Sequence, residues 1–183
     1  MKRFVLTTVV LLAVSATSWG RSIELDVHDK ALGFNYINNE SIIIKGMGVE
    51  AGLLLNESTK PLLHVGINVA GVNKSEQGIF DIAIGGRLYS WQESSSSFTA
   101  IALGGGVRFS PLVRVGLSAH LYVSPDITAF GDSSGMSDLM VRADYQVIPQ
   151  AFVYLGFRKI GVSIAGSTID LDKNTHIGLK LLF

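Results

Sequence analysis

A serine, a histidine and an aspartate lie close together in this sequence and suggest a hydrolytic site. Ser118 and His120 are two positions apart, so they would share one face of a strand, and Asp126 follows in the next connection. A serine nucleophile needs a base and an acid that orients the base, and these three residues are the candidates for those roles. We favour the simpler interpretation, in which His120 makes hydrogen bonds inside the fold and the protein is not an enzyme.

Ten charged residues form a second candidate site, because they occupy the polar positions of segments in which apolar and polar residues alternate. Six are basic and four are acidic. The simpler interpretation is a network in which each buried charge has a partner, since an unpaired buried charge is costly. The alternative is a narrow pore or a small-anion site lined by the excess of arginine. The ten residues are Glu50, Asp81, Arg87, Arg108, Arg114, Asp138, Arg142, Asp144, Arg158 and Lys180.

The composition excludes several other kinds of site. The 183 residues include no cysteine, which rules out disulfides, thiolate zinc sites and cysteine nucleophiles. The four histidines are scattered, so we expect neither a metal ion nor any other cofactor. Basic and acidic residues each number 15, and without a basic excess we expect no nucleic-acid partner.

The elements that must position these residues are strands. From residue 42 onward apolar and polar residues alternate with a period of two, which is typical of strands with one apolar face. The segments have about the 9 to 11 residues with which a tilted strand crosses a bilayer. We therefore predict an all-β fold, a transmembrane antiparallel β-barrel. Its eight strands are expected at 47–55, 63–70, 80–89, 101–109, 113–122, 139–147, 153–158 and 176–183.

Residues 21–41 are more ambiguous. Ile23, Leu25 and Val27 alternate with acidic residues, and residues 32–37 are compatible with another short strand. One extra strand would give an odd number, which single-chain bacterial barrels avoid. We favour an N-terminal segment over 21–41 and eight strands over 42–183, with ten strands as the alternative. No linker is visible, so residues 21–183 are expected to form a single domain.

The first 20 residues have the pattern of a secretory signal peptide. Lys2 and Arg3 precede an apolar run over 4–16, and Ser18 and Gly20 are small residues near a cleavage site. The run is shorter than the roughly 20 residues that a membrane-spanning helix needs. We expect cleavage after Gly20 and export of the remaining chain.

Alternation alone does not say which face of the barrel is apolar. A soluble periplasmic, lipocalin-like ligand-binding barrel would show the same pattern with its apolar face inside. The polar positions, however, hold mainly Gly, Ala and Ser with a few Arg and Asp, which suits the narrow interior of a small barrel better than a solvent-exposed surface. We therefore expect the apolar side chains to face lipid and the charged ones to face the lumen.

The connections between the segments differ in length. Those at 110–112 and 148–150 are tight, whereas those at 124–135 and 165–175 are long. Outer-membrane barrels have short periplasmic turns and longer external loops, so we place the long connections outside the cell. Phe183 directly follows an alternating strand and resembles the assembly signal of outer-membrane barrels. The candidate residues of the extracellular loop, explained by turn chemistry or by partner binding, are Pro125, Asp126, Phe130, Gly131 and Asp132.

Several short stretches carry a family resemblance. They are ALGGGVRFSP at 102–111, YVSPD at 122–126 with FGD at 130–132, AFVYLGFR at 151–158, the closing strand to Phe183, and SIELD at 22–26. They resemble the YfaZ family of predicted outer-membrane proteins over most of the chain after the signal segment. This resemblance implies an outer-membrane location, with a porin label for some members, and no catalytic residues.

The sequence therefore predicts a small outer-membrane β-barrel of structural, adhesive or weakly pore-forming, porin-like character, with no specific activity. The alternatives are a lipid-modifying hydrolase of the outer leaflet and a soluble lipocalin-like barrel. The expected partners are outer-membrane lipid and, during biogenesis, the barrel assembly machinery. A monomer is expected.

Overall fold

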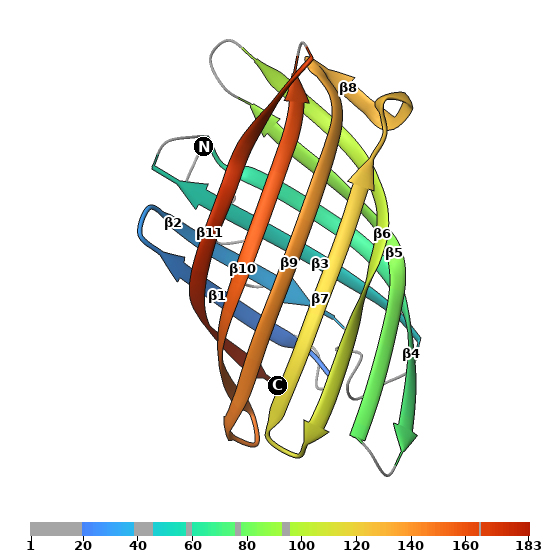
Figure 1. Ribbon diagram of the computed structural model, residues 1–183, viewed down its shortest axis with the longest axis vertical. Helices are drawn as coiled ribbons and strands as arrows, with labels where there is room; N and C mark the ends of the chain where they lie inside the picture. The colour runs from blue at the N-terminus through green and yellow to red at the C-terminus, as the bar shows by residue number, and fades with distance from the viewer. Residues whose placement is uncertain (1–19, 39–45, 58–59, 76–77, 93–95, 165) are drawn as a thin grey trace.

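The computed structural model describes residues 20–38, 46–57, 60–75, 78–92, 96–164 and 166–183, so the predicted signal peptide lies almost wholly outside the described residues. These residues form a closed antiparallel barrel of ten strands with one short strand outside the wall (Figure 1). None of their helices is long and apolar enough to cross a bilayer. The barrel strands are β1 (Ser22–His28), β2 (Ala31–Ile37), β3 (Gly46–Asn56), β4 (Leu62–Ser75), β5 (Gly78–Gln92), β6 (Ser97–Leu112), β7 (Val115–Ser124), β9 (Ser133–Ile148), β10 (Ala151–Ile164) and β11 (Ser167–Leu182).

Antiparallel pairing of β1 with β11 closes the barrel. The pairing begins with Ser22 opposite Leu182 and covers six residue pairs. The Phe183 N–H extends it by donating to the Arg21 carbonyl over 3.0 Å. Between β7 and β9 the chain forms the 3-10 turn η1 (Asp126–Thr128) and the strand β8 (Ala129–Gly131), which pairs with residues 98–100 of β6 outside the wall. β7 therefore pairs with β9 in the barrel.

The two rims of the barrel differ in their connections. The terminal rim holds Arg21 and Phe183 together with the two-residue turns at 113–114 and 149–150. The distal rim holds the β1–β2 turn at 29–30, η1 and β8 (Figure 1). The distal rim carries the excursion through η1 and β8, whereas the terminal rim combines the two tight turns with the eight-residue connection between β2 and β3.

The number of strands differs from the expected eight. Each of the eight predicted segments corresponds to one barrel strand, although 113–122 begins two residues before β7 and 176–183 ends one residue after β11. Residues 22–37 supply two more strands, β1 and β2. Ten, the alternative number, is correct and eight is wrong. The two strands have only seven residues each, fewer than seven of the eight predicted segments, yet they pair along their whole length from Ser22–Ile37 to His28–Ala31. Because they come as a pair, the count stays even.

The expected long connection at 165–175 is also wrong, because β11 begins at Ser167. Ile160 of β10 pairs with Asp172 and Gly161 pairs with Asp170, so Leu171 forms a β-bulge between them. The bulge changes the phase of the strand, and Asp172 is buried while Asp170 is exposed. These polar residues belong to a strand near the distal rim, although in the sequence they resemble a loop.

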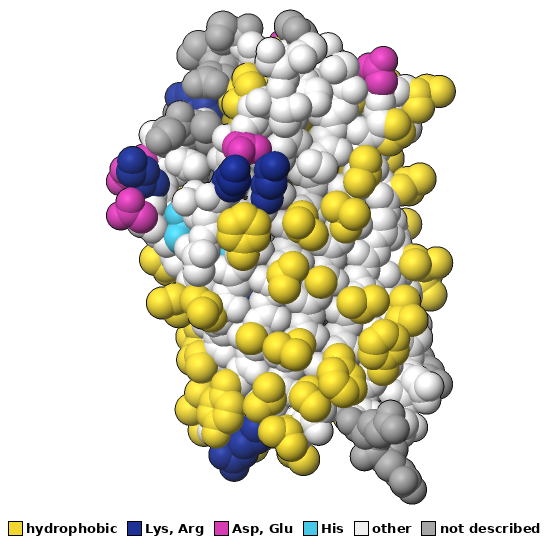
Figure 2. Space-filling model, viewed as in Figure 1, with side chains coloured by type: hydrophobic (Ala, Val, Ile, Leu, Met, Phe, Trp, Pro, Cys, Tyr) yellow, Lys and Arg dark blue, Asp and Glu magenta, His cyan; other side chains and the backbone are white. Residues whose placement is uncertain are grey.

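Apolar side chains are spread over the face of the wall that Figure 2 shows, and every barrel strand carries exposed large apolar side chains. Ile82 and Leu179 are 49% and 38% exposed, whereas Arg87 and Arg142 are each 8% exposed. This is the expected orientation, and it is opposite to that of a soluble barrel with an apolar lumen. Placing a charged side chain on the outer face of a barrel at the centre of a bilayer costs about 2–4 kcal/mol of stability. A wall whose outer face is apolar is therefore compatible with lipid.

The interior has two parts. Near the distal rim, apolar and aromatic side chains pack together, and the rings of Trp91 and Phe98 have centroids 5.6 Å apart. Between this group and the terminal rim most buried side chains are charged. We call the apolar group the plug; its members are Ala31, Leu54, Leu62, Tyr89, Trp91, Phe98, Ala100, Ala102, Tyr122, Met136, Ile160, Val162 and Leu171.

Candidate functional site

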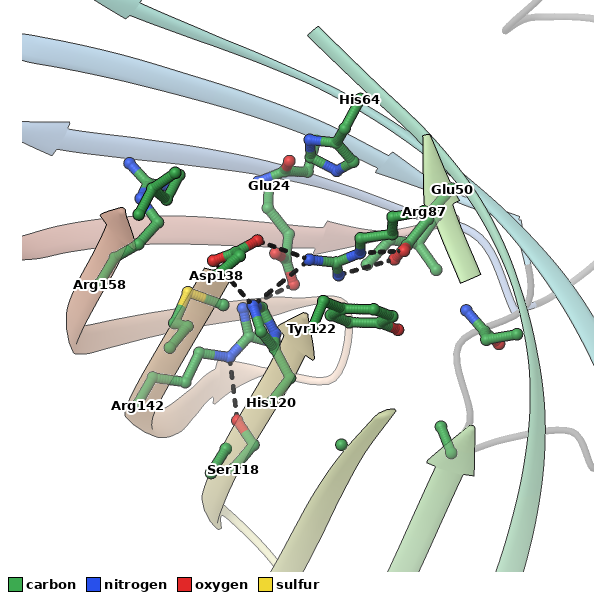
Figure 3. A pocket seen from close by; sticks show the side chains of 18 of the residues that line it. Glu24, Glu50, His64, Arg87, Ser118, His120, Tyr122, Asp138, Arg142 and Arg158 are labelled. Atoms are coloured by element: carbon green, nitrogen blue, oxygen red, sulfur yellow. Dashed lines mark hydrogen bonds and ion pairs between the residues drawn. The ribbon is translucent and has the colours of Figure 1, made fainter. Parts of the chain in front are cut away.

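Charged side chains from seven of the ten barrel strands meet in the lumen and form the candidate site (Figure 3). Arg114 is a correction to the predicted set: it is exposed in the turn between β6 and β7. The alternation over 113–122 assigned it to the lumen, but β7 begins only at Val115, so its side chain has no inward position. The other nine predicted residues are at most 8% exposed, namely Glu50, Asp81, Arg87, Arg108, Asp138, Arg142, Asp144, Arg158 and Lys180.

Arg87 on β5 is the centre of the first ion-pair group. Its Nη2 lies 3.1 Å from Oε2 of Glu50 on β3, and its Nη1 lies 3.0 Å from Oδ2 of Asp138 on β9. The Tyr122 ring packs against the guanidinium with its centroid 4.0 Å from Cζ. The Tyr89 hydroxyl donates to the same Asp138 carboxylate over 2.6 Å. One cation therefore connects three strands across the lumen.

Arg158 on β10 is the centre of a second group. Its Nε donates to Asp172 on β11 over 2.7 Å, and its Nη1 donates to Asp26 on β1 over 3.1 Å. The Tyr154 hydroxyl also donates to Asp26. His28 Nε2 lies 3.3 Å from Oδ1 of Asp172. This group spans the β1–β11 closure from the inside.

Two more arginines are paired in the same manner. Arg142 on β9 lies 2.8 Å from Oε1 of Glu24 on β1 and donates from Nε to the Ser118 hydroxyl over 3.2 Å. Arg108 on β6 holds the carboxylate of Asp144 with both terminal nitrogens, one of them over 2.7 Å. All four buried arginines of the described chain thus have a carboxylate partner, as expected of a lumen network.

Lys180 and Asp81 lie nearer the terminal rim. Lys180 Nζ is 3.9 Å from Oε1 of Glu24 and 5.6 Å from the centroid of the Phe152 ring. Asp81 is opposite Arg108 in the register of β5 and β6 and is 2% exposed. Both side chains extend the set of buried charges toward this rim.

The charge balance of the lumen differs from the one that the sequence suggested. Among the described residues, the buried charges are seven acidic and five basic side chains. Glu24, Asp26 and Asp172 join the network, and Arg114 leaves it, so there is no excess of arginine to attract a small anion. The signal for the first two was present in the sequence, because they alternate with apolar residues over 22–27.

A cavity of about 170 Å³ remains among these side chains. His64, Arg87, His120 and Asp138 are among its lining residues (Figure 3). Since one water molecule needs about 10–15 Å³ of such space, the cavity has room for water or for a small polar molecule. Within the described ranges, no three His, Asp or Glu side chains are grouped so that they could hold a metal ion.

The three candidate hydrolase residues are not assembled. Ser118 and His120 share the lumen-facing side of β7, as their spacing predicts. Ser118, however, accepts a hydrogen bond from Arg142, and His120 Nε2 lies 3.6 Å from Oδ1 of Asp138. Asp126 is exposed in η1 at the distal rim. The acidic neighbour of His120 is therefore Asp138.

The remaining predicted residues lie at the two rims. The Ser97 N–H donates to the Asp132 carboxylate over 2.8 Å, which fastens the segment after β8 to the start of β6. Phe183 lies at the terminal rim and is 44% exposed. The five predicted loop residues follow β7 at the distal rim, where η1 and β8 lie; they are Pro125, Asp126, Phe130, Gly131 and Asp132.

Comparisons with known proteins agree with the family resemblance. The family model described as YfaZ precursor matches residues 1–183, so the chain belongs to the YfaZ family. No curated protein sequence matches the chain. One similar solved structure is described as "NanC porin structure in rhombohedral crystal form"; it is 9% identical, covers 91% of this chain and 99% of its own, and has a TM-score of 0.46. A similarity of this degree does not transfer that protein's properties to this chain.

Proposed function

We propose that this member of the YfaZ family is an outer-membrane protein that spans the bilayer as a ten-stranded, porin-like barrel. The observation that carries the proposal is the division of side chains by the wall, with apolar residues outside and paired charges inside. The hydrocarbon of a bilayer accepts apolar side chains on the outside of the wall, and it excludes charged ones. The two-residue turns at 113–114 and 149–150, with the excursion through η1 and β8 at the opposite rim, support an orientation with the terminal rim in the periplasm and the distal rim outside the cell.

Membrane fractionation tests this proposal. We expect the full chain, produced in Gram-negative cells, to occur in the outer-membrane fraction and to migrate differently on a gel before and after heating. A protein recovered only from the soluble periplasm, with the same mobility before and after heating, would overturn the proposal.

We further propose that the barrel assembly machinery inserts the chain, with Phe183 as part of its signal, and that the barrel is a monomer.

The lumen supports a structural role more than an open pore. The plug fills the distal part of the lumen, with Tyr89 and Val162 fully buried in it, and the charged groups connect strands across the remainder. We therefore propose that the barrel conducts few ions in this conformation. The cavity of about 170 Å³ supports weak pore formation as the second candidate.

Recording in planar bilayers distinguishes the two candidates. Trp91→Ala combined with Phe98→Ala removes two large rings from the plug, so we expect measurable conductance from this variant and near-background conductance from the wild type. Phe80→Ala is the matched control, because Phe80 is an aromatic residue on the outside of the wall. A large, steady conductance from the wild type would favour the pore, and equal conductance of both folded proteins would show that the plug does not limit flow.

We also propose that the protein is not an enzyme. Ser118 and His120 make contacts with Arg142 and Asp138 in the lumen, where the wall separates them from lipid. The exposed residues of η1 and β8 at the distal rim support an adhesive role as a further candidate function.

A further inference from the structure

A shallow apolar groove lies on the outer surface of the wall, across β6, β7, β9 and β10. Its volume is about 540 Å³. Ala119 and Ala143 line it, and the larger side chains of Leu117, Val141 and Phe157 surround these small ones. A depression of this kind within an apolar belt offers an acyl chain more contact than a flat wall would.

One end of the groove is marked by two lysines. Phe157 pairs with Thr175 at the edge of the groove, and the next outward pair along β10 and β11 is Lys159 with Lys173. Two residues of a strand rise by about 7 Å, so the ammonium groups lie just beyond the apolar lining, toward the distal rim. Figure 2 shows two basic side chains directly above apolar ones on this face. The lysines are 43% and 57% exposed.

A single carboxylate lies between the two ammonium groups. Asp170 is 3.9 Å from Lys159 Nζ and 3.8 Å from Lys173 Nζ. It reaches this position because the bulge at Leu171 turns it outward. The three groups together keep one net positive charge at the end of an apolar groove. Snorkelling explains a lysine at the edge of the belt, but it does not explain two lysines in register above a groove.

We propose that the groove and the lysine pair bind a phosphate-bearing acyl lipid of the outer leaflet, with one acyl chain in the groove and the phosphate between Lys159 and Lys173. The site lies on the distal side of the belt, which is the outer leaflet in the proposed orientation. The inference therefore rests on the proposed membrane function and deepens it. A phosphate offers more negative charge than Asp170 and would compete with that carboxylate for both ammonium groups.

Native mass spectrometry with dioleoylphosphatidic acid tests the site. The barrel is refolded in detergent, freed of lipid, and titrated with this lipid. We expect one tightly held molecule per barrel and an affinity about tenfold lower for K159A/K173A, because each lysine near anionic headgroups contributes about fivefold and Asp170 already offsets part of that. D170N should bind more tightly, and the affinity of the control K60A/K74A should equal that of the wild type, because its two lysines lie outside the groove lining.

Two further arms separate the lipid from its parts. Dioleoylglycerol has the acyl chains without the phosphate, and inorganic phosphate has no acyl chain. We expect each of them to bind more weakly than phosphatidic acid. Ala143→Leu should lower the affinity by filling the groove, whereas Ala51→Leu, outside the groove lining, should not. Three results would overturn the inference. They are complete displacement of the lipid by inorganic phosphate, unchanged lipid binding by K159A/K173A, and a dimer that excludes lipid.

The test also separates this inference from the proposed function. Every variant is first checked for heat-dependent gel mobility and outer-membrane location. A variant series that folds in the outer membrane but shows no difference in lipid binding overturns only the lipid site. A wild type that does not reach the outer membrane overturns the proposed function itself.

Discussion

Replacement of Arg87 by methionine tests the lumen network most directly. Methionine approximates the aliphatic part of arginine and removes the charge, so the carboxylates of Glu50 and Asp138 stay buried without their shared cation. Removing one partner of a buried ion pair costs about 3–5 kcal/mol of unfolding free energy. Arg87 serves two carboxylates, but the neighbouring cavity admits water that solvates them in part. We therefore expect a loss of about 3 kcal/mol.

Urea unfolding of the barrel in lipid vesicles measures this loss, with the folded fraction read from the mobility of unheated samples on a gel. The control is the triple variant E50Q/R87M/D138N, which removes the cation and both negative charges together. We expect it to regain much of the stability that R87M loses. A loss below about 1 kcal/mol for R87M, the value typical of an exposed pair, would refute the reasoning, as would a triple variant that is no more stable than R87M.

The remaining predictions concern the two faces of the wall. Gly178→Ala should lower the unfolding free energy by about 1–3 kcal/mol, because its new Cβ would overlap the Tyr154 ring, whereas at Gly71 an added Cβ has no neighbour within 4 Å and alanine should be tolerated. Urea titration measures the unfolding free energy of the alanine variants at Gly178 and Gly71, and an equal loss in both would contradict this prediction. Ile84→Arg on the outer face should cost about 2–4 kcal/mol, and Val113→Arg, in a turn of the terminal rim, close to nothing. Equal costs in vesicles would argue against a membrane-embedded wall.

The alternation of the sequence could predict the faces of the strands, because large apolar and charged side chains fall on opposite phases at nearly every position. Ile82 and Arg87 therefore lie on the predicted sides. β1 and β2 were harder to predict, since the sequence of residues 21–41 favours an N-terminal segment or one extra strand, and one extra strand would have made the count odd. Arg114 was wrongly assigned to the lumen because alternation does not show at which residue a strand begins, and β7 begins only at Val115.

The partners within the lumen could not be predicted from the sequence. Glu50 and Asp138 lie 37 and 51 positions from Arg87, and only the register of the strands brings the three together. Alternation specifies a face but not a register. The plug was predictable only in part: Trp91 has the parity of Arg87 along β5 and therefore an inward face, but its contact with Phe98 depends on the register of β5 and β6.

The closure of the wall by β1 and β11 has a consequence for how the barrel forms. Asp26 and Arg158, which meet across it, are 132 positions apart along the chain. Until these strands meet, each presents a row of unsatisfied backbone groups, and hydrocarbon makes such an open edge expensive. Because contacts between residues so far apart in sequence form more slowly than local hairpins, we expect this seam to be the last part of the wall to pair in the proposed membrane setting.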